Sequence, residues 1–366
     1  MTSLFRALRG RPFALLWGGQ AISLLGDRLF DIALAWWVLE ETGSAVVMGT
    51  VFVLSILPML IFLLIGGVLV DRFPRLGLML VSDLTRGLVV GLMAALAFTD
   101  LLVLWHVYVF SLVSGFVEAF FQPAYRAVVP DVTPREDLTS ANSLTSLSEQ
   151  FGGIAGPALG ATIVAAGGTP LAFALDSLSF AVSGVCLLAI ARRATSPGHS
   201  ETSPGIIGDL REGLATVAAS PWLWVTIAVA GLSNIAYTGP MDVGLPFLIK
   251  EHRHADVSVL GLFYSAASVG SVLAAIGLCR VPRLRRRGLT LYSAWMLIGI
   301  MVILIGLPIP IPGILAAAFV QDFKMQYDDR FHSGLLSQFR EGYSSKVSPR
   351  RLTGKGRSLS LVGYHE

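Results

Sequence analysis

The stretch GGIAGPALGA, residues 152–161, places four glycines and a proline inside a long apolar run. Glycine and proline are the weakest helix formers in water. In a bilayer, however, Gly152, Gly156 and Gly160 recur every four residues and clear one helix face for a close neighbour. Pro157 removes one backbone hydrogen bond and kinks the helix, which lipid tolerates only where other helices surround it. The stretch predicts a bent, smooth-faced helix at the seam between two helical bundles.

The whole chain has the composition of an integral membrane protein. Its 366 residues are 54% hydrophobic and 14% charged, with a mean hydropathy of +0.70, whereas a soluble domain has about 25% charged residues. A bilayer core needs about 20 apolar residues per helix. Ten apolar runs are found, the last one short: Pro12–Leu39, Ala45–Val70, Leu76–Phe98, Leu101–Val128, Thr139–Ala166, Pro170–Ile190, Pro221–Ile249, Val257–Cys279, Gly288–Leu307 and Ile311–Val320.

Basic residues indicate how these runs cross the bilayer. With the N-terminus in the cytoplasm, the inside segments hold fifteen arginines, while the outside loops hold only Lys250 and Arg253. Such an excess of inside Lys and Arg sets the orientation of membrane proteins. We therefore expect a cytoplasmic N-terminus and at least nine spans.

The loop after the second run carries a recognisable pattern. In GGVLVDRFPRLGLML (66–80), Gly67, Asp71, Arg72 and Arg75 match the signature loop of the major facilitator superfamily, which this segment resembles. Gly67 is expected to allow close helix packing, and both arginines hold the loop inside. The basic loop GLCRVPRLRRRG (277–288) resembles a degenerate copy, as expected if the two halves are repeats.

The fifth run resembles the antiporter motif of exporters in the same superfamily, through Gly152, Gly156, Pro157 and Gly160. Residues 16–44, 121–144 and 173–184 are similar to its drug:H+ antiporter group, which contains macrolide and enterobactin exporters. The resemblance implies an all-α integral membrane protein with the major facilitator fold. It would have two pseudo-repeated helical bundles and about ten of the family's twelve transmembrane helices.

The domains expected on this basis are as follows: an N-terminal six-helix bundle (1–192), a cytoplasmic linker with an amphipathic helix (193–220), an incomplete four-helix C-terminal bundle (221–322) and a polar cytoplasmic tail (323–366). Three of the chain's four lysines lie after Val320, in a segment without a membrane-length run. Two explanations stay open: a disordered basic tail, or a product of truncation or frameshift near residue 320.

Charged residues inside the runs are the candidate functional groups, because ionised side chains are expensive at bilayer depth. Asp27 and Asp31 are four residues apart and share one helix face, with Arg28 a quarter turn away. Either Arg28 and Asp31 neutralise each other, or Asp27 or Asp31 carries a proton.

Four further charges complete the set. Asp83 and Arg86 are expected to form a structural i,i+3 pair near the cytoplasmic end of their run. Glu118 is a second protonation candidate. Asp242 follows Gly239 and Pro240, so a broken helix could place it at a cavity. Asp176 is expected near the outer surface.

The resemblance implies a proton-coupled efflux transporter that exports small amphipathic molecules, such as drugs, macrolides or siderophores, by alternating access. Its partners would be that substrate, protons and the bilayer. We expect a monomer in the bacterial cytoplasmic membrane, with no nucleic acid, cofactor or metal. No phosphate-binding Gly-x-x-x-x-Gly-Lys-Ser/Thr motif is present in the sequence.

Three other functions are compatible with parts of the sequence. An uptake facilitator of the same superfamily fits the antiporter motif less well. A non-functional relative would explain the missing spans. A membrane enzyme or lipid-handling protein would need clustered catalytic or metal-binding residues, and the six histidines are scattered. We therefore expect no enzyme.

Overall fold

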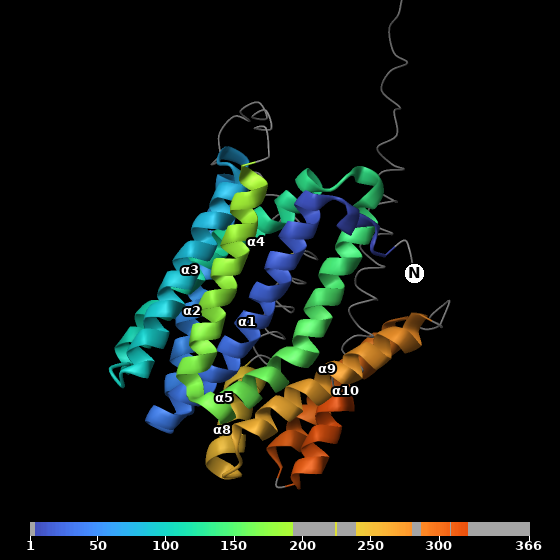
Figure 1. The fold of residues 1–366 in the computed structure, drawn as a ribbon. Helices are drawn as coiled ribbons and strands as arrows, with labels where there is room; N and C mark the ends of the chain where they lie inside the picture. The colour runs from blue at the N-terminus through green and yellow to red at the C-terminus, as the bar shows by residue number, and fades with distance from the viewer. Residues whose placement is uncertain (1–3, 193–223, 225–238, 280–286, 308, 321–366) are drawn as a thin grey trace, which may run out of the picture.

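Long helices that run back and forth form the first half of the chain. The structure is a computed structural model that describes residues 4–192, 224, 239–279, 287–307 and 309–320. Its first half (residues 4–192) contains the short helix η1 (Arg6–Arg9) and the long helices α1 (Arg11–Thr42), α2 (Ala45–Arg72), α3 (Arg75–Phe98), α4 (Leu104–Val132) and α5 (Leu138–Ala191), with η2 (Arg135–Asp137) before α5. Figure 1 shows α1 among the other helices of this half.

Helix α5 reverses direction at Gly168. This residue has φ 75° and ψ 173°, a backbone conformation outside the helical region that glycine adopts easily. The break separates a first arm, residues 138–167, from a second arm, residues 169–191. These arms occupy the two runs predicted at Thr139–Ala166 and Pro170–Ile190.

The second half, as far as the structure describes it, is also helical. It contains η3 (Gly239–Gly244), α8 (Leu245–Phe247), η4 (Leu248–His252), α9 (Val257–Cys279) and α10 (Arg287–Gly306), followed by a helix at Ile311–Val320. The turns η3 and η4 are π-helical. Helix α9 crosses the first arm of α5 (Figure 1). The linker with its amphipathic helix predicted at 193–220 and the tail after residue 320 lie outside the described residues.

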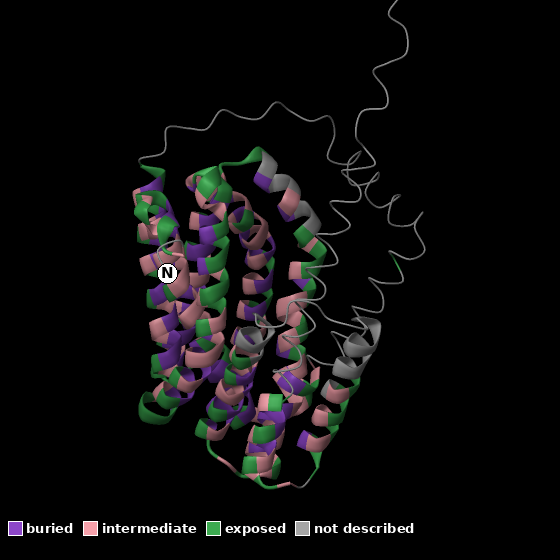
Figure 2. Ribbon diagram, turned by 90° about the vertical axis from the view of Figure 1, so that its right-hand side faces the viewer, coloured by how far each residue is buried: buried purple, intermediate pink, exposed green. Residues whose placement is uncertain are grey.

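Burial follows the pattern of a bundle surrounded by lipid. Buried residues gather where helices face each other, and exposed ones line the outside (Figure 2). Phe13, Leu144 and Phe173 are fully buried, whereas Leu88 and Val185 point outward. Among the described residues, four helices are long and apolar enough to cross a membrane. Since lipid is as apolar as leucine, the outward-facing leucines need no protein partner.

The close approach expected at Gly67 occurs one residue earlier. A side chain at Gly66 would collide with the backbone oxygen of Ala119 in α4, whereas one at Gly67 would meet open space. The two positions lie 100° apart around α2, so only Gly66 faces α4. The prediction for Gly67 was therefore wrong, and Gly66 permits the close contact of α2 with α4.

Candidate functional site

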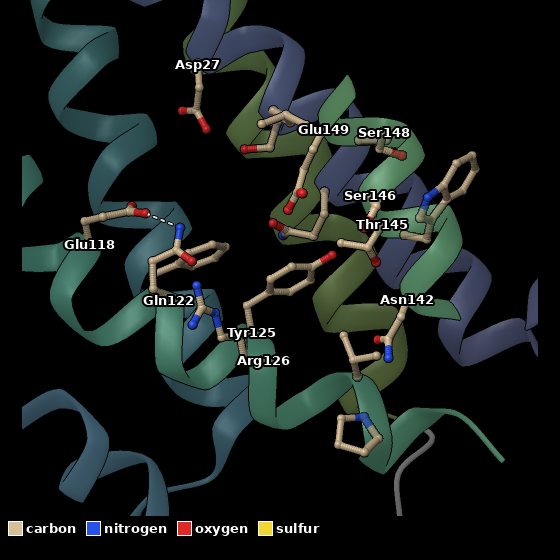
Figure 3. Close-up of a pocket in the computed structure, with 18 of the residues that line it drawn as sticks. Asp27, Glu118, Gln122, Tyr125, Arg126, Asn142, Thr145, Ser146, Ser148 and Glu149 are labelled. Carbon is tan, nitrogen blue, oxygen red and sulfur yellow. Dashed lines mark hydrogen bonds between the residues drawn. The ribbon is translucent and has the colours of Figure 1, made fainter. Parts of the chain in front are cut away.

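A polar cavity of about 560 Å³ lies between α1, α3, α4 and the first arm of α5. It occupies the half of the bundle where α1 begins and α4 ends. Figure 3 shows Gln122 and Tyr125 of α4 facing Thr145 and Glu149 of α5 across this space. The wall combines aromatic, amide, hydroxyl and charged side chains, and so offers both apolar surface and hydrogen-bonding groups.

One arginine joins two carboxylates at this cavity. Nη2 of Arg86 in α3 lies 2.7 Å from Oδ1 of Asp27 in α1, and its Nη1 lies 2.9 Å from Oε2 of Glu118 in α4. We call Asp27, Arg86 and Glu118 the charge triad. The Arg86 side chain is 11% exposed and those of Asp27 and Glu118 are 36% and 24% exposed, so the acids remain accessible from the cavity.

Aromatic rings and an amide support the triad. The Arg86 guanidinium lies 4.4 Å from the ring centre of Phe180 and 5.3 Å from that of Phe121. Such cation–π contacts stabilise a desolvated cation. The Gln122 amide donates a hydrogen bond of 2.7 Å to Glu118, as the dashed line in Figure 3 shows. Arg86 and Glu118 are thereby held at fixed positions on the cavity wall.

The predicted pair of Asp83 with Arg86 was wrong. Arg86 turns to the triad, while Asp83 is fully buried and accepts a hydrogen bond of 2.6 Å from Ser183 in the second arm of α5. Gln20 of α1 donates to the same serine at 2.8 Å. Asp83 and Arg86 therefore bind different partners, each of which lies on another helix.

Asp31 faces a different cavity from Asp27. A smaller cavity of about 250 Å³ is lined by Arg28, Asp31, Asp242 and Tyr264, among others. Arg28 Nη1 lies 3.4 Å from Asp31 Oδ2, so these two side chains do form the ion pair that was one of the two interpretations. The π-helical turn η3 brings Asp242 of the second half to this cavity. The two candidate acids of α1 are thus separated.

Asp176 is also placed differently from the prediction. It is 1% exposed, inside the bundle rather than near the outer surface. Its carboxylate accepts a hydrogen bond of 3.2 Å from Ser179, and both residues pack against Gly26 of α1. A larger residue than glycine would collide with them, so Gly26 allows α1 to approach the second arm of α5.

The signature loop is connected to the end of α4. Arg75 Nη1 lies 2.7 Å from Oδ2 of Asp131 and donates a hydrogen bond of 3.4 Å to the backbone oxygen of Ala127. Arg72 is exposed, and the Asp71 side chain lies outside the described part. Arg75 therefore links the α2–α3 loop to α4 at this end of the bundle.

The antiporter motif packs within the first half. Gly152 faces Leu24, Gly156 faces Arg28 and Gly160 faces Leu29 and Ile32, all in α1. As predicted, α5 lies at the seam between the two halves, but its motif glycines face α1 rather than the seam. The seam lies on the adjacent face of the same helix, where Gly261 of α9 approaches Ala161 and the backbone oxygen of Pro157.

Apolar membrane-length helices around a cavity lined by paired charges are typical of membrane transporters. The chain belongs to the transmembrane secretion effector family of the major facilitator superfamily, whose pattern matches residues 2–317.

Three relatives with assigned functions are exporters. The chain is 24% identical to macrolide efflux protein A of Streptococcus pyogenes over 351 residues, covering 96% of this chain and 84% of the relative. It is 27% identical to the multidrug efflux pump Tap of Mycolicibacterium fortuitum, over 81% of this chain and 74% of the pump. It is also 27% identical to the enterobactin exporter EntS of Salmonella typhi, with 81% and 70% covered.

Solved structures share the fold. A bacterial homologue of the iron transporter ferroportin in an inward-facing state superimposes with a TM-score of 0.69 at 16% identity, covering 92% of this chain and 87% of that one. A bacterial homologue of the lysosomal transporter Spinster gives a TM-score of 0.60 at 15% identity, with 87% and 74% covered. The predicted major facilitator fold is thereby confirmed.

Proposed function

We propose that this membrane transporter exports small amphipathic molecules from bacterial cells in exchange for protons, by alternating access. The observation that carries the proposal is the charge triad at the polar cavity, where Arg86 contacts both Asp27 and Glu118. The assigned functions of the relatives support export as the direction. The N-terminus would be cytoplasmic and the cavity would open to that side.

The triad provides a simple form of coupling. With both acids ionised, the net charge of the triad is −1. Protonation of one acid makes the triad neutral and breaks the ion pair between that acid and Arg86. The released arginine or acid then interacts with a substrate or with water, which changes the free energy of the cavity-open state. One elementary charge crossing 100 mV supplies about 2.3 kcal/mol, so a membrane potential adds a useful driving force.

The mixed lining of the cavity supports an amphipathic substrate. Trp17, Phe121 and Tyr125 offer aromatic surface, and Gln20 and Asn142 offer amide groups. Apolar walls bind by surface area, whereas the few polar groups orient the ligand. Asp31 of the first half and Asp242 of the second half line the same smaller cavity. We therefore propose them as further proton-coupling acids.

The test is proton-driven accumulation of a dye or macrolide panel in inverted membrane vesicles. We predict that Asp27→Asn and Glu118→Gln each reduce gradient-driven accumulation at least about tenfold while substrate exchange without a gradient persists. Glu149→Gln is the matched control, since Glu149 lines the same cavity outside the triad. Accumulation that is equal with and without a gradient would overturn proton coupling, and its absence for every substrate would favour a non-functional relative.

A further inference from the structure

Two serines of α9 connect the two halves of the chain through the backbone of α5. Ser265 Oγ donates a hydrogen bond of 3.0 Å to the backbone oxygen of Ile154. One turn further, Ser268 Oγ donates a hydrogen bond of 2.6 Å to the backbone oxygen of Gly153. Gly153 lies beside the motif glycines but on the face toward α9, where an added side chain would press on Ser268.

The acceptor of the Ser268 bond is special because of Pro157. In an α-helix the N–H of residue i donates to the carbonyl of residue i−4. The carbonyl of Gly153 would therefore accept from the N–H of residue 157, but that residue is proline, which has no N–H. In lipid a carbonyl without a donor is costly, because no water replaces the missing bond. The Ile154 carbonyl differs, since Ala158 retains its N–H.

We propose that Ser268 is a positioning residue for transport: its hydroxyl replaces the donor that Pro157 withholds from Gly153, and so holds α9 on α5 in this conformation. A conformational change that moved α9 away would leave the Gly153 carbonyl without a hydrogen-bond donor. The proline in α5 and the serine in α9 therefore act as one unit, although they belong to different halves of the chain. This inference rests on the proposed alternating access, whose conformational balance the hydrogen bond would set.

A double-mutant cycle tests the unit directly. Ser268→Ala is made in the native chain and in a Pro157→Ala chain, where residue 157 regains its N–H. Each variant is purified in detergent, and its thermal unfolding midpoint is measured. Ser268→Ala is expected to lower the midpoint in the native chain and to lower it by less than half as much when Pro157 is replaced.

A cysteine reporter measures the conformation. With Cys186 and Cys279 replaced, Ser146→Cys places a single thiol on the wall of the polar cavity, and its reaction rate with a bulky maleimide reports how often the cavity is open. A net hydrogen bond corresponds to a factor of about two to ten in an equilibrium. Ser268→Ala should therefore slow the labelling by about that factor, while Ser268→Thr, which keeps the hydroxyl, should restore it.

Ser265→Ala is the matched control and should leave both readouts nearly unchanged, because Ile154 keeps its helical donor. An equal effect of Ser268→Ala in both backgrounds, or an effect of Ser265→Ala as large as that of Ser268→Ala, would overturn the proposal. If the Pro157→Ala chain does not fold, the comparison of the serine variants in the native chain decides. Neither readout uses a substrate or a gradient, so failure here is distinct from failure of proton-coupled export.

Discussion

At the residue scale, the positive charge of Arg86 is the feature on which the polar cavity most depends. Arg86→Gln would leave the carboxylates of Asp27 and Glu118 without a counter-charge. Removing one partner of a fully buried ion pair costs about 3–5 kcal/mol. The two acids are partly exposed, at 36% and 24%, so we predict a smaller loss of stability, seen as a lower unfolding midpoint, together with loss of transport. Adding Asp27→Asn should recover part of the stability, because one unpaired charge disappears. Thermal unfolding of the purified variants measures both effects.

Arg75→Gln is the control for this prediction. Arg75 also pairs with an acid on another helix, Asp131, but the two side chains are 36% and 40% exposed. Exposed ion pairs contribute about 0–1 kcal/mol, so the unfolding midpoint should change little. A loss for Arg75→Gln as large as that for Arg86→Gln, or further destabilisation by Asp27→Asn, would contradict the interpretation.

The acids of the site could be predicted from the sequence, but their partners could not. Asp27 and Glu118 stand out because ionised groups inside apolar runs need a reason. Arg86 was assigned to Asp83 because spacing within one helix is the only distance that a single sequence provides. Its true partners lie on α1 and α4, and which helices touch is decided by the packing of the bundle. Gln122 carried a weak signal, since it lies four residues after Glu118 on the same face.

At the element scale, the contact between α2 and α4 depends on one of two adjacent glycines. Gly66→Ala would push a methyl group into the Ala119 backbone oxygen, whereas Gly67→Ala meets open space. We predict that Gly66→Ala lowers the yield and the unfolding midpoint of the protein. Gly67→Ala should be neutral or slightly stabilising, since alanine favours a helix by about 1 kcal/mol over glycine. Equal effects of the two substitutions on the midpoint would show that the contact is not close.

The helices themselves could largely be predicted from the sequence, whereas the packing partner of each helix face could not. Apolar length placed α2 and α3 almost to the residue, and the two arms of α5 follow from Gly168, which lies between two runs, the second of which begins at Pro170. The four-residue glycine period correctly marks a face for close packing. It does not say which helix covers that face. Here α1 covers it, and the residues beside it meet α9.

At the scale of the whole molecule, the end of α1 and the turn η4 connect the two halves on the side opposite the polar cavity. Lys250 Nζ lies 4.7 Å from the ring centre of Trp36 and donates a hydrogen bond of 3.5 Å to the Trp36 backbone oxygen. In contrast, Arg253 donates a hydrogen bond of 2.7 Å to the backbone oxygen of Leu307, within the second half. Two cations of one segment therefore make different connections.

Lys250 should accordingly control access to the smaller cavity from that side, and Arg253 should not. A cation–π contact is worth about 0.5–2 kcal/mol, so Lys250→Gln is expected to raise the labelling rate of a cysteine at Ser55, which lines that cavity, by about two- to tenfold. The reagent is a membrane-impermeant maleimide applied to intact cells, with Cys186 and Cys279 replaced. Arg253→Gln should leave the rate unchanged, because Leu307 belongs to the same half. If both variants raise it equally, general loosening of the segment is responsible, and the contact between Lys250 and Trp36 does not hold the halves together.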